Sequence, residues 1–185
     1  MGNFYTNYTL RGASPQAVAT ALAGRTAIVT PEHNGTVVVF DEESDSQDSG
    51  VIAQLGAHLS SQLRCAVLAV LNHDDDVLFY QLFDGGSLAD EYCSAPGYFS
   101  GDDSPASGGD AQKLCSAFGV SSVEAVSPIL HAPDDSDGYT FAVEQHEALV
   151  HALGISDYSV GAGFNYVSEG ELPGDLTEDS LLRVQ

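Results

Sequence analysis

The sequence predicts an α+β fold built on a mostly antiparallel sheet. Strand-like apolar runs and stretches with helical spacing follow one another over residues 1–93. Asn34-Gly35 and Asp84-Gly85-Gly86 each separate two strand-like runs, which is the signal of a β-hairpin. Helical spacing prevails after residue 110. Hydrophobic residues make up 43% of the chain, so a core can form.

A strand and a short helix open the chain. Residues 4–10 alternate, and Phe4, Thr6, Tyr8 and Leu10 share one face, which predicts a half-buried strand. Ser14 and Pro15 then provide an N-cap and a proline at the first helical position. Gly24 is placed to end this helix.

The next elements extend the sheet. Ile52, Leu55, Leu59 and Leu63 recur at helical spacing and predict a helix over residues 48–63. The predicted strands are residues 26–30, 36–40, 65–71, 77–83 and 87–93. The first six elements follow the order β-α-β-β-α-β. This order is typical of the ferredoxin-like split βαβ arrangement, with two helices on one face, and here a further hairpin extends it.

The second half of the chain predicts a helical segment in the same domain. Residues 94–110 form a loop rich in Gly, Ser and Asp that follows the sheet core of residues 1–93. The helical segment covers residues 111–168 and packs on that core. Its parts are helices over residues 111–118, 123–130 (interrupted by Pro128) and 141–153, and a last strand over residues 160–167. Residues 169–185 form an acidic, mobile tail that Leu176, Leu181 and Leu182 can dock.

The charge is strongly unbalanced, with 27 Asp and Glu against 5 Lys and Arg and a net charge of -22. Such a surface attracts cations or cationic partners. Without a Lys/Arg cluster the chain is not expected to bind nucleic acid. It has neither an export signal nor an apolar run of about 18 residues, which predicts a cytoplasmic protein without a membrane partner. The three cysteines are then expected to be reduced thiols.

One segment partly matches a calcium loop of the EF-hand type. With Gly138 at the sixth position, Asp135, Asp137 and Glu144 take the third, fifth and twelfth positions. Pro133 stands at the first position and has no side-chain oxygen. The pattern therefore allows a calcium site at these three acids, or an Asp-rich turn that caps the next helix without metal.

A second segment falls short of a zinc motif. His146 and His151 are five residues apart, whereas two zinc ligands on one helical face are four apart. At about 100° per residue the two rings differ by about 140° in direction. A π-bulge would be needed to bring them together, and a simple pair of Glu147 with His151 is the alternative.

Carboxylates and aromatic residues gather near the second predicted hairpin. The aromatic side chains are Tyr80, Phe83, Tyr92, Tyr98 and Phe99. Acids steer a cationic partner and tyrosine gives rigid contact area. The residues predicted to bind such a partner are Asp74, Asp75, Asp76, Asp90, Glu91 and Tyr92, with Tyr92 as the aromatic anchor. Two alternatives remain, namely a divalent cation held by Asp74–Asp76 with Asp41 or Glu42, and an ordinary solvated turn beside a buried hairpin.

Three classes of function follow. The first is a non-enzymatic interaction protein, similar in character to immunity proteins or inhibitors, that binds a basic partner. The second is an ordinary function beneath an acidic surface adapted to concentrated salt. The third is a metal-assisted enzyme or a calcium-binding protein. The first is preferred because no catalytic residues and no cofactor can be assigned from sequence motifs.

Overall fold

A single antiparallel sheet organises the computed structural model, which describes residues 2–131 and 138–185. In the described part of the chain the strand order is β7-β6-β5-β4-β1-β3-β2-β8, and all neighbours are antiparallel. The strands are β1 (Phe4–Arg11), β2 (Ala27–Val29), β3 (Thr36–Asp41), β4 (Val67–His73), β5 (Val77–Asp84), β6 (Ser87–Cys93), β7 (Ser107–Gly108) and β8 (Leu182–Val184). The predicted α+β class is thus confirmed, while the ferredoxin-like interpretation stays a prediction.

Some of the helices begin where the sequence supplies a side-chain cap. Ser14 Oγ accepts from Ala17 N, and the Asp48 carboxylate accepts from Gly50 N and Val51 N, so each satisfies N–H groups of a first helical turn. The helices are α1 (Pro15–Ala21), α2 (Ser49–Leu63), α3 (Ala111–Phe118), α4 (Val123–Leu130), α5 (Ala142–Leu153) and α6 (Phe164–Ser168).

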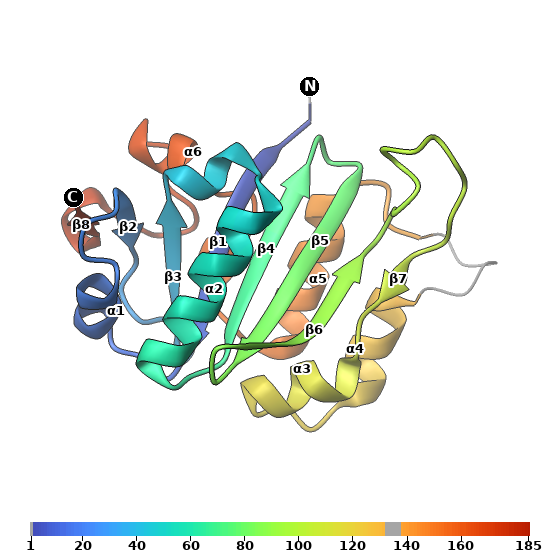
Figure 1. The fold of residues 1–185 in the computed structure, drawn as a ribbon, viewed down its shortest axis with the longest axis horizontal. Coiled ribbons are helices and arrows are strands. Elements are labelled where there is room, and N and C mark those ends of the chain that lie inside the picture. Colours follow the sequence, from blue (N-terminus) through green and yellow to red (C-terminus); the bar gives the residue numbers. More distant parts are fainter. Residues whose placement is uncertain (1, 132–137) are drawn as a thin grey trace.

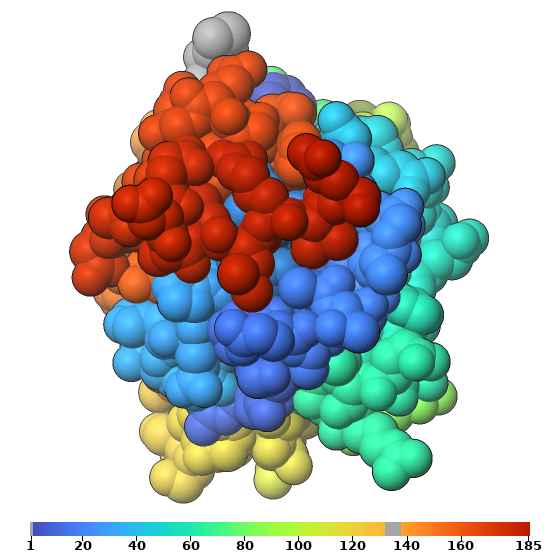
Figure 2. Space-filling view, turned by 90° about the vertical axis from the view of Figure 1, so that its left-hand side faces the viewer, coloured from blue at the N-terminus to red at the C-terminus, as the bar shows by residue number. Residues whose placement is uncertain are grey.

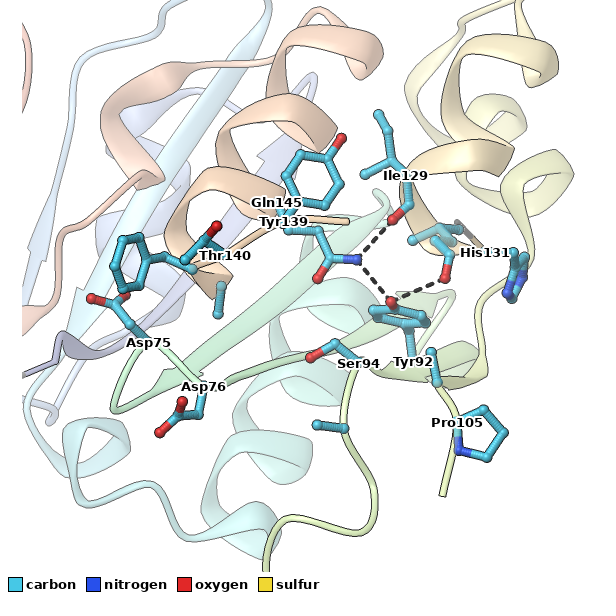
Figure 3. A pocket seen from close by; sticks show the side chains of 15 residues that line it. Asp75, Asp76, Tyr92, Ser94, Pro105, Ile129, His131, Tyr139, Thr140 and Gln145 are labelled. Carbon is cyan, nitrogen blue, oxygen red and sulfur yellow. Dashed lines mark hydrogen bonds between the residues drawn. The ribbon is translucent and has the colours of Figure 1, made fainter. Parts of the chain in front are cut away.

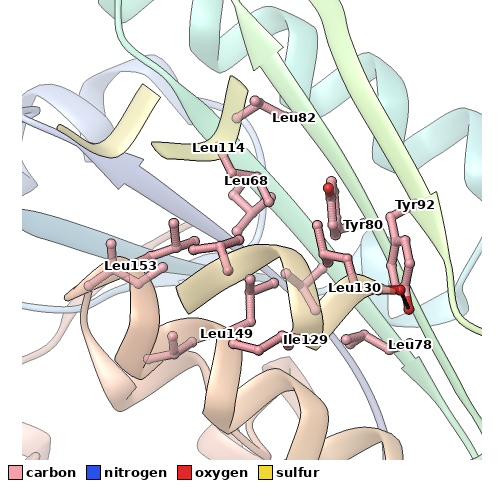
Figure 4. Packing of buried hydrophobic residues seen from close by; sticks show 14 of the residues in the cluster. Leu68, Leu78, Tyr80, Leu82, Tyr92, Leu114, Ile129, Leu130, Leu149 and Leu153 are labelled. Atoms are coloured by element: carbon pink, nitrogen blue, oxygen red, sulfur yellow. Dashed lines mark hydrogen bonds between the residues drawn. The ribbon is translucent and has the colours of Figure 1, made fainter. Parts of the chain in front are cut away.

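Helices cover both faces of the sheet (Figure 1). One buried cluster joins α1 and α2 to β1–β5, and it includes Tyr8 and Leu10. A second cluster packs α3, α4 and α5 against the opposite face, and it includes Tyr80 of β5 and Leu130 of α4 (Figure 4). Residues 5–10 of β1 are therefore all buried, and the prediction of a half-buried strand is wrong because this strand is covered on both sides.

The last part of the chain corrects two predictions. Residues 160–167 do not form a strand, because Phe164 and Val167 are buried three residues apart in the helix α6. The tail is docked rather than mobile, since β8 pairs with β2 and the leucines that could dock it, Leu176, Leu181 and Leu182, pack on the core. Figure 2 shows this C-terminal segment lying against the N-terminal part of the chain.

Among the described residues, no helix combines the length and the apolar character needed to cross a bilayer. Cys65, Cys93 and Cys115 are all free thiols in the structure.

Candidate functional site

The turn between β4 and β5 carries three of the predicted site residues. Asp74 and Asp75 adopt positive φ angles of 55° and 59°, which Asp tolerates better than most residues. The Asp75 carboxylate accepts from Asn3 N at 3.1 Å and from Asn72 Nδ2 at 3.0 Å, and its carbonyl accepts from Ala142 N at 2.7 Å. Asp75 therefore holds β1 and α5 to the turn and is a structural residue.

Asp74 and Asp76 lie on either side of Asp75 in the same turn. Asp74 accepts one hydrogen bond from Gly2 N at 3.0 Å and is half-buried. Asp76 is exposed. These two carboxylates are the ones in the turn that remain accessible to a partner.

An exposed group of aromatic rings surrounds His73 at the end of β4. The ring centroid of His73 lies 4.9 Å from that of Phe4, 5.0 Å from that of Phe99 and 5.7 Å from that of Tyr98. Their exposed fractions are 43% for Phe4, 40% for Tyr98 and 74% for Phe99. We call these four residues the His73 cluster.

The accessible carboxylates lie close to this cluster. The pKa of the Tyr98 hydroxyl is raised by partial desolvation and by the negative charges of Asp76 and Asp74. The sequence predicted Tyr92 as the tyrosine beside the acids, whereas in the structure Tyr98 is the tyrosine that packs on His73, the residue next to Asp74 in the chain.

His73 is held in one orientation. Its Nδ1 lies 2.7 Å from Gln47 Oε1, which can only accept, so Nδ1 carries the proton of this bond. Gln47 Nε2 donates in turn to Asn72 O at 2.8 Å. The ring that organises the aromatic cluster is thus fixed before any partner arrives.

A hollow of about 390 Å³ opens beside the cluster, and we call it the Phe99 pocket. The first turn of α2, the strands β4–β6 and Phe99 enclose it. It is lined by Ser46, Gln47, Ser49, Ile52, Leu71, His73, Val77, Phe79, Cys93 and Phe99. The pKa of the Cys93 thiol is raised by burial and by the charge of Glu91, against one backbone hydrogen bond, so the thiol stays protonated at neutral pH and is a poor nucleophile.

A second hollow, of about 380 Å³, lies on the other side of the sheet between β6, α4 and α5 (Figure 3). Tyr92 OH donates to Leu130 O at 3.0 Å and accepts from Gln145 Nε2 at 2.8 Å. Gln145 Nε2 also donates to Ile129 O at 2.7 Å. These donors join β6, α4 and α5, so this network is structural.

The structure corrects the predicted role of Tyr92. Its side chain is 1% exposed and its ring stacks on Tyr80 with 5.4 Å between centroids, so it does not reach a partner as an aromatic anchor. Alternation along β6 turns this side chain toward the helices of the second cluster. Tyr98 and Phe99, from the same aromatic group of the sequence, occupy the exposed position instead.

Asp90 and Glu91 are also engaged within the fold. Asp90 accepts from Tyr80 OH at 2.7 Å and from Asp110 N at 2.8 Å, so it links β6 to the start of α3. Glu91 is exposed and accepts from Gln81 Nε2 at 2.8 Å. The structure therefore does not bring these two acids into the His73 cluster.

The predicted calcium ligands fall partly outside the described residues, because Asp135 and Asp137 lie within 132–137. Glu144 accepts from Phe141 N at 3.1 Å and Thr140 N at 3.2 Å, and so caps the start of α5. A calcium site there stays a prediction.

Other metal arrangements are not formed by the residues that the structure describes, among which no three His, Cys, Asp or Glu side chains are grouped to hold an ion. His146 is 1% exposed and its Nδ1 lies 2.8 Å from Tyr5 OH, while His151 is exposed. Asp41, considered as a partner of the Asp74–Asp76 turn, is bound by Arg25 instead, at 2.7 Å.

No family model, curated protein or solved structure matches this chain.

Proposed function

We propose that this chain is a non-enzymatic interaction protein that engages a basic protein partner through the His73 cluster and the carboxylates of Asp74 and Asp76. The observation that carries the proposal is the exposure of Tyr98 and Phe99, whose rings pack on His73. His73 is the residue that precedes Asp74 in the β4–β5 turn. Exposed aromatic residues that gather at one place are typical of contact surfaces.

The chemistry of the cluster suits lysine and arginine. Guanidinium and ammonium groups stack on aromatic faces and pair with carboxylates, and both types of group are available here. A net charge of -22 adds long-range steering toward a cationic surface. The fixed orientation of His73 favours binding, because little side-chain freedom is lost there on association.

A hexa-arginine peptide provides a direct test. Asp74→Asn combined with Asp76→Asn removes two charges at the cluster. Glu169→Gln combined with Glu171→Gln removes two charges from exposed residues of the C-terminal segment, and both variants have the same net charge. Affinities are measured by titration calorimetry at low salt.

We expect the variant of the turn to bind the peptide about fivefold more weakly and to show a flatter dependence on salt, because two nearby attractive charges are lost. The control variant should change affinity by less than about twofold. Equal losses in the two variants would show that the peptide senses only the overall charge, and the proposed site would be wrong.

A further inference from the structure

We infer that the Phe99 pocket takes up one bulky apolar side chain, preferably aromatic, from the basic segment that docks on the His73 cluster. This inference rests on the proposed function and names the kind of segment that the site selects. The partner would present an apolar anchor with lysine or arginine on either side of it.

The size of the pocket fits a single side chain. Its volume of about 390 Å³ is at the lower end of ordinary ligand pockets. A folded element does not fit into such a space, whereas an aromatic side chain with part of its backbone does. One aromatic ring inserted into a pocket is the usual form of a binding hot spot.

The lining of the pocket selects an apolar occupant. Its walls are Ile52, Leu71, Val77, Phe79 and Phe99, and none of the described lining residues is a carboxylate. The amide of Gln47 is already bonded to His73 and to Asn72 O. A cation placed inside would lose its hydration without a compensating partner, so the pocket disfavours it.

Negative charge reaches the Phe99 pocket through Tyr98. Asp76 and Asp74 act on the Tyr98 hydroxyl. The Tyr98 ring packs on His73 and Phe99, which line the pocket. Asp76 also lines the hollow on the other side of the sheet, so its charge lies between the two hollows. This charge complementarity identifies the flanking residues of the occupant as basic. The apolar interior and the acidic rim together describe one partner segment, with an apolar centre and cationic neighbours.

The chain contains no tryptophan, so a tryptophan in a peptide is a clean fluorescent reporter. The probe is the peptide Lys-Lys-Trp-Lys-Lys, and the same peptide with Ala in place of Trp is the reference. Phe99→Ala removes an exposed wall of the pocket. Phe141→Ala tests the hollow on the other side of the sheet, because Phe141 is 50% exposed and lines it together with Asp75 and Asp76. Leu88→Ala is the matched control, because Leu88 in β6 is 51% exposed and lies outside both hollows.

We expect the tryptophan peptide to bind about tenfold more tightly than the alanine peptide, with its emission shifted to shorter wavelength. Phe99→Ala should remove most of this tenfold difference, and it should weaken binding of the alanine peptide by less than about twofold, because that peptide loses only the contact of its lysines with one ring of the His73 cluster. Phe141→Ala should leave the tenfold difference between the two peptides intact, and Leu88→Ala should change neither affinity.

The outcomes separate this inference from the proposed function. If both peptides bind equally and Phe99→Ala has no effect, while the Asp74→Asn and Asp76→Asn variant weakens both, the pocket is not the anchor site but the acidic docking surface stands. If the double Asn variant weakens neither peptide, the proposed function fails as well. A loss of the emission shift in Phe141→Ala alone would place the anchor in the other hollow and overturn the inference.

Discussion

His146 is a base that the fold keeps neutral. It lies in α5 at 1% exposure, where its Nδ1 forms a hydrogen bond of 2.8 Å with Tyr5 OH. Burial lowers the pKa of His146 from 6.5 to about 3, because a charged imidazole has no water around it there. Between these two pH values the unfolded chain binds a proton that the folded chain does not, so His146 makes stability fall as pH drops through this window.

Urea unfolding at pH 7 and pH 4.5 measures this contribution. At pH 4.5, two units below 6.5, His146 lowers the free energy of unfolding by about 3 kcal/mol. His146→Gln should remove this amount from the difference in the free energy of unfolding between pH 7 and pH 4.5. His151→Gln, an exposed histidine of the same helix, controls for the protonation of the many carboxylates. If the two variants respond equally to pH, His146 is not kept neutral by the fold.

The buried carboxylate of Asp41 is neutralised by an ion pair with Arg25. Asp41 is 1% exposed and accepts from Arg25 Nε and Nη2 at 2.7 Å, and from Ser44 N at 3.0 Å. Arg25→Met leaves this carboxylate with only its Ser44 bonds, and we expect a loss of about 3 kcal/mol in chemical unfolding. Arg183→Met breaks the exposed pair with Glu178 and should cost less than about 1 kcal/mol. If the two substitutions lowered the free energy of unfolding by similar amounts, burial of Asp41 would not determine the strength of its ion pair.

Among the secondary-structure elements, those with strong local signals were predictable. The capped helix α2, the two hairpin turns and the helix α3, which ends at Gly119, follow from spacing and turn residues. The strand predicted over residues 160–167 was wrong, because tertiary contacts determine the conformation of this segment. Asn7 Nδ2 donates to Ser159 O and Ala162 O, and the Asp45 carboxylate accepts from Asn165 N at the start of α6. Side chains far away in the sequence fix this segment, so local alternation could not reveal it.

The strand β8 protects one edge of the sheet. Its residues Leu182–Val184 pair with Ala27–Val29 of β2, and Leu182 and Val184 pack on the cluster beneath α1. Deleting residues 182–185 removes this pairing and burial, and we expect a loss of roughly 2 kcal/mol in urea unfolding. The amides of β2 should exchange faster, and the freed edge should favour self-association in light scattering. An unchanged midpoint would mean that the tail adds nothing to the fold.

For the molecule as a whole, the proposed site follows only in part from the sequence. The acids of the β4–β5 turn were identified because they are adjacent in the sequence. The aromatic surface could not be identified in this way. It depends on the pairing of Phe4 with His73 across β1 and β4, and on the loop that brings Phe99 back to His73. Such contacts between distant segments are set by topology, which the sequence pattern does not fix.

The net charge of -22 remains compatible with adaptation to salt, and stability can test that alternative. Salt screens electrostatic interactions, and the Debye length falls from about 10 Å at 0.1 M salt to about 3 Å at 1 M. If repulsion among the acids limits stability, 1 M NaCl should raise the melting temperature by roughly 5 °C, measured by circular dichroism.

The melting temperatures of two double variants can distinguish adaptation to salt from retention of the acids for a partner. If Asp74 and Asp76 are retained for a partner despite their mutual repulsion, Asp74→Asn with Asp76→Asn should raise the low-salt melting temperature more than Glu169→Gln with Glu171→Gln does. In 1 M NaCl this advantage should largely disappear. If the two double variants raise the low-salt melting temperature equally, Asp74 and Asp76 contribute to repulsion only as part of the general surface charge. The acids at the His73 cluster would then destabilise the fold no more than other exposed acids do.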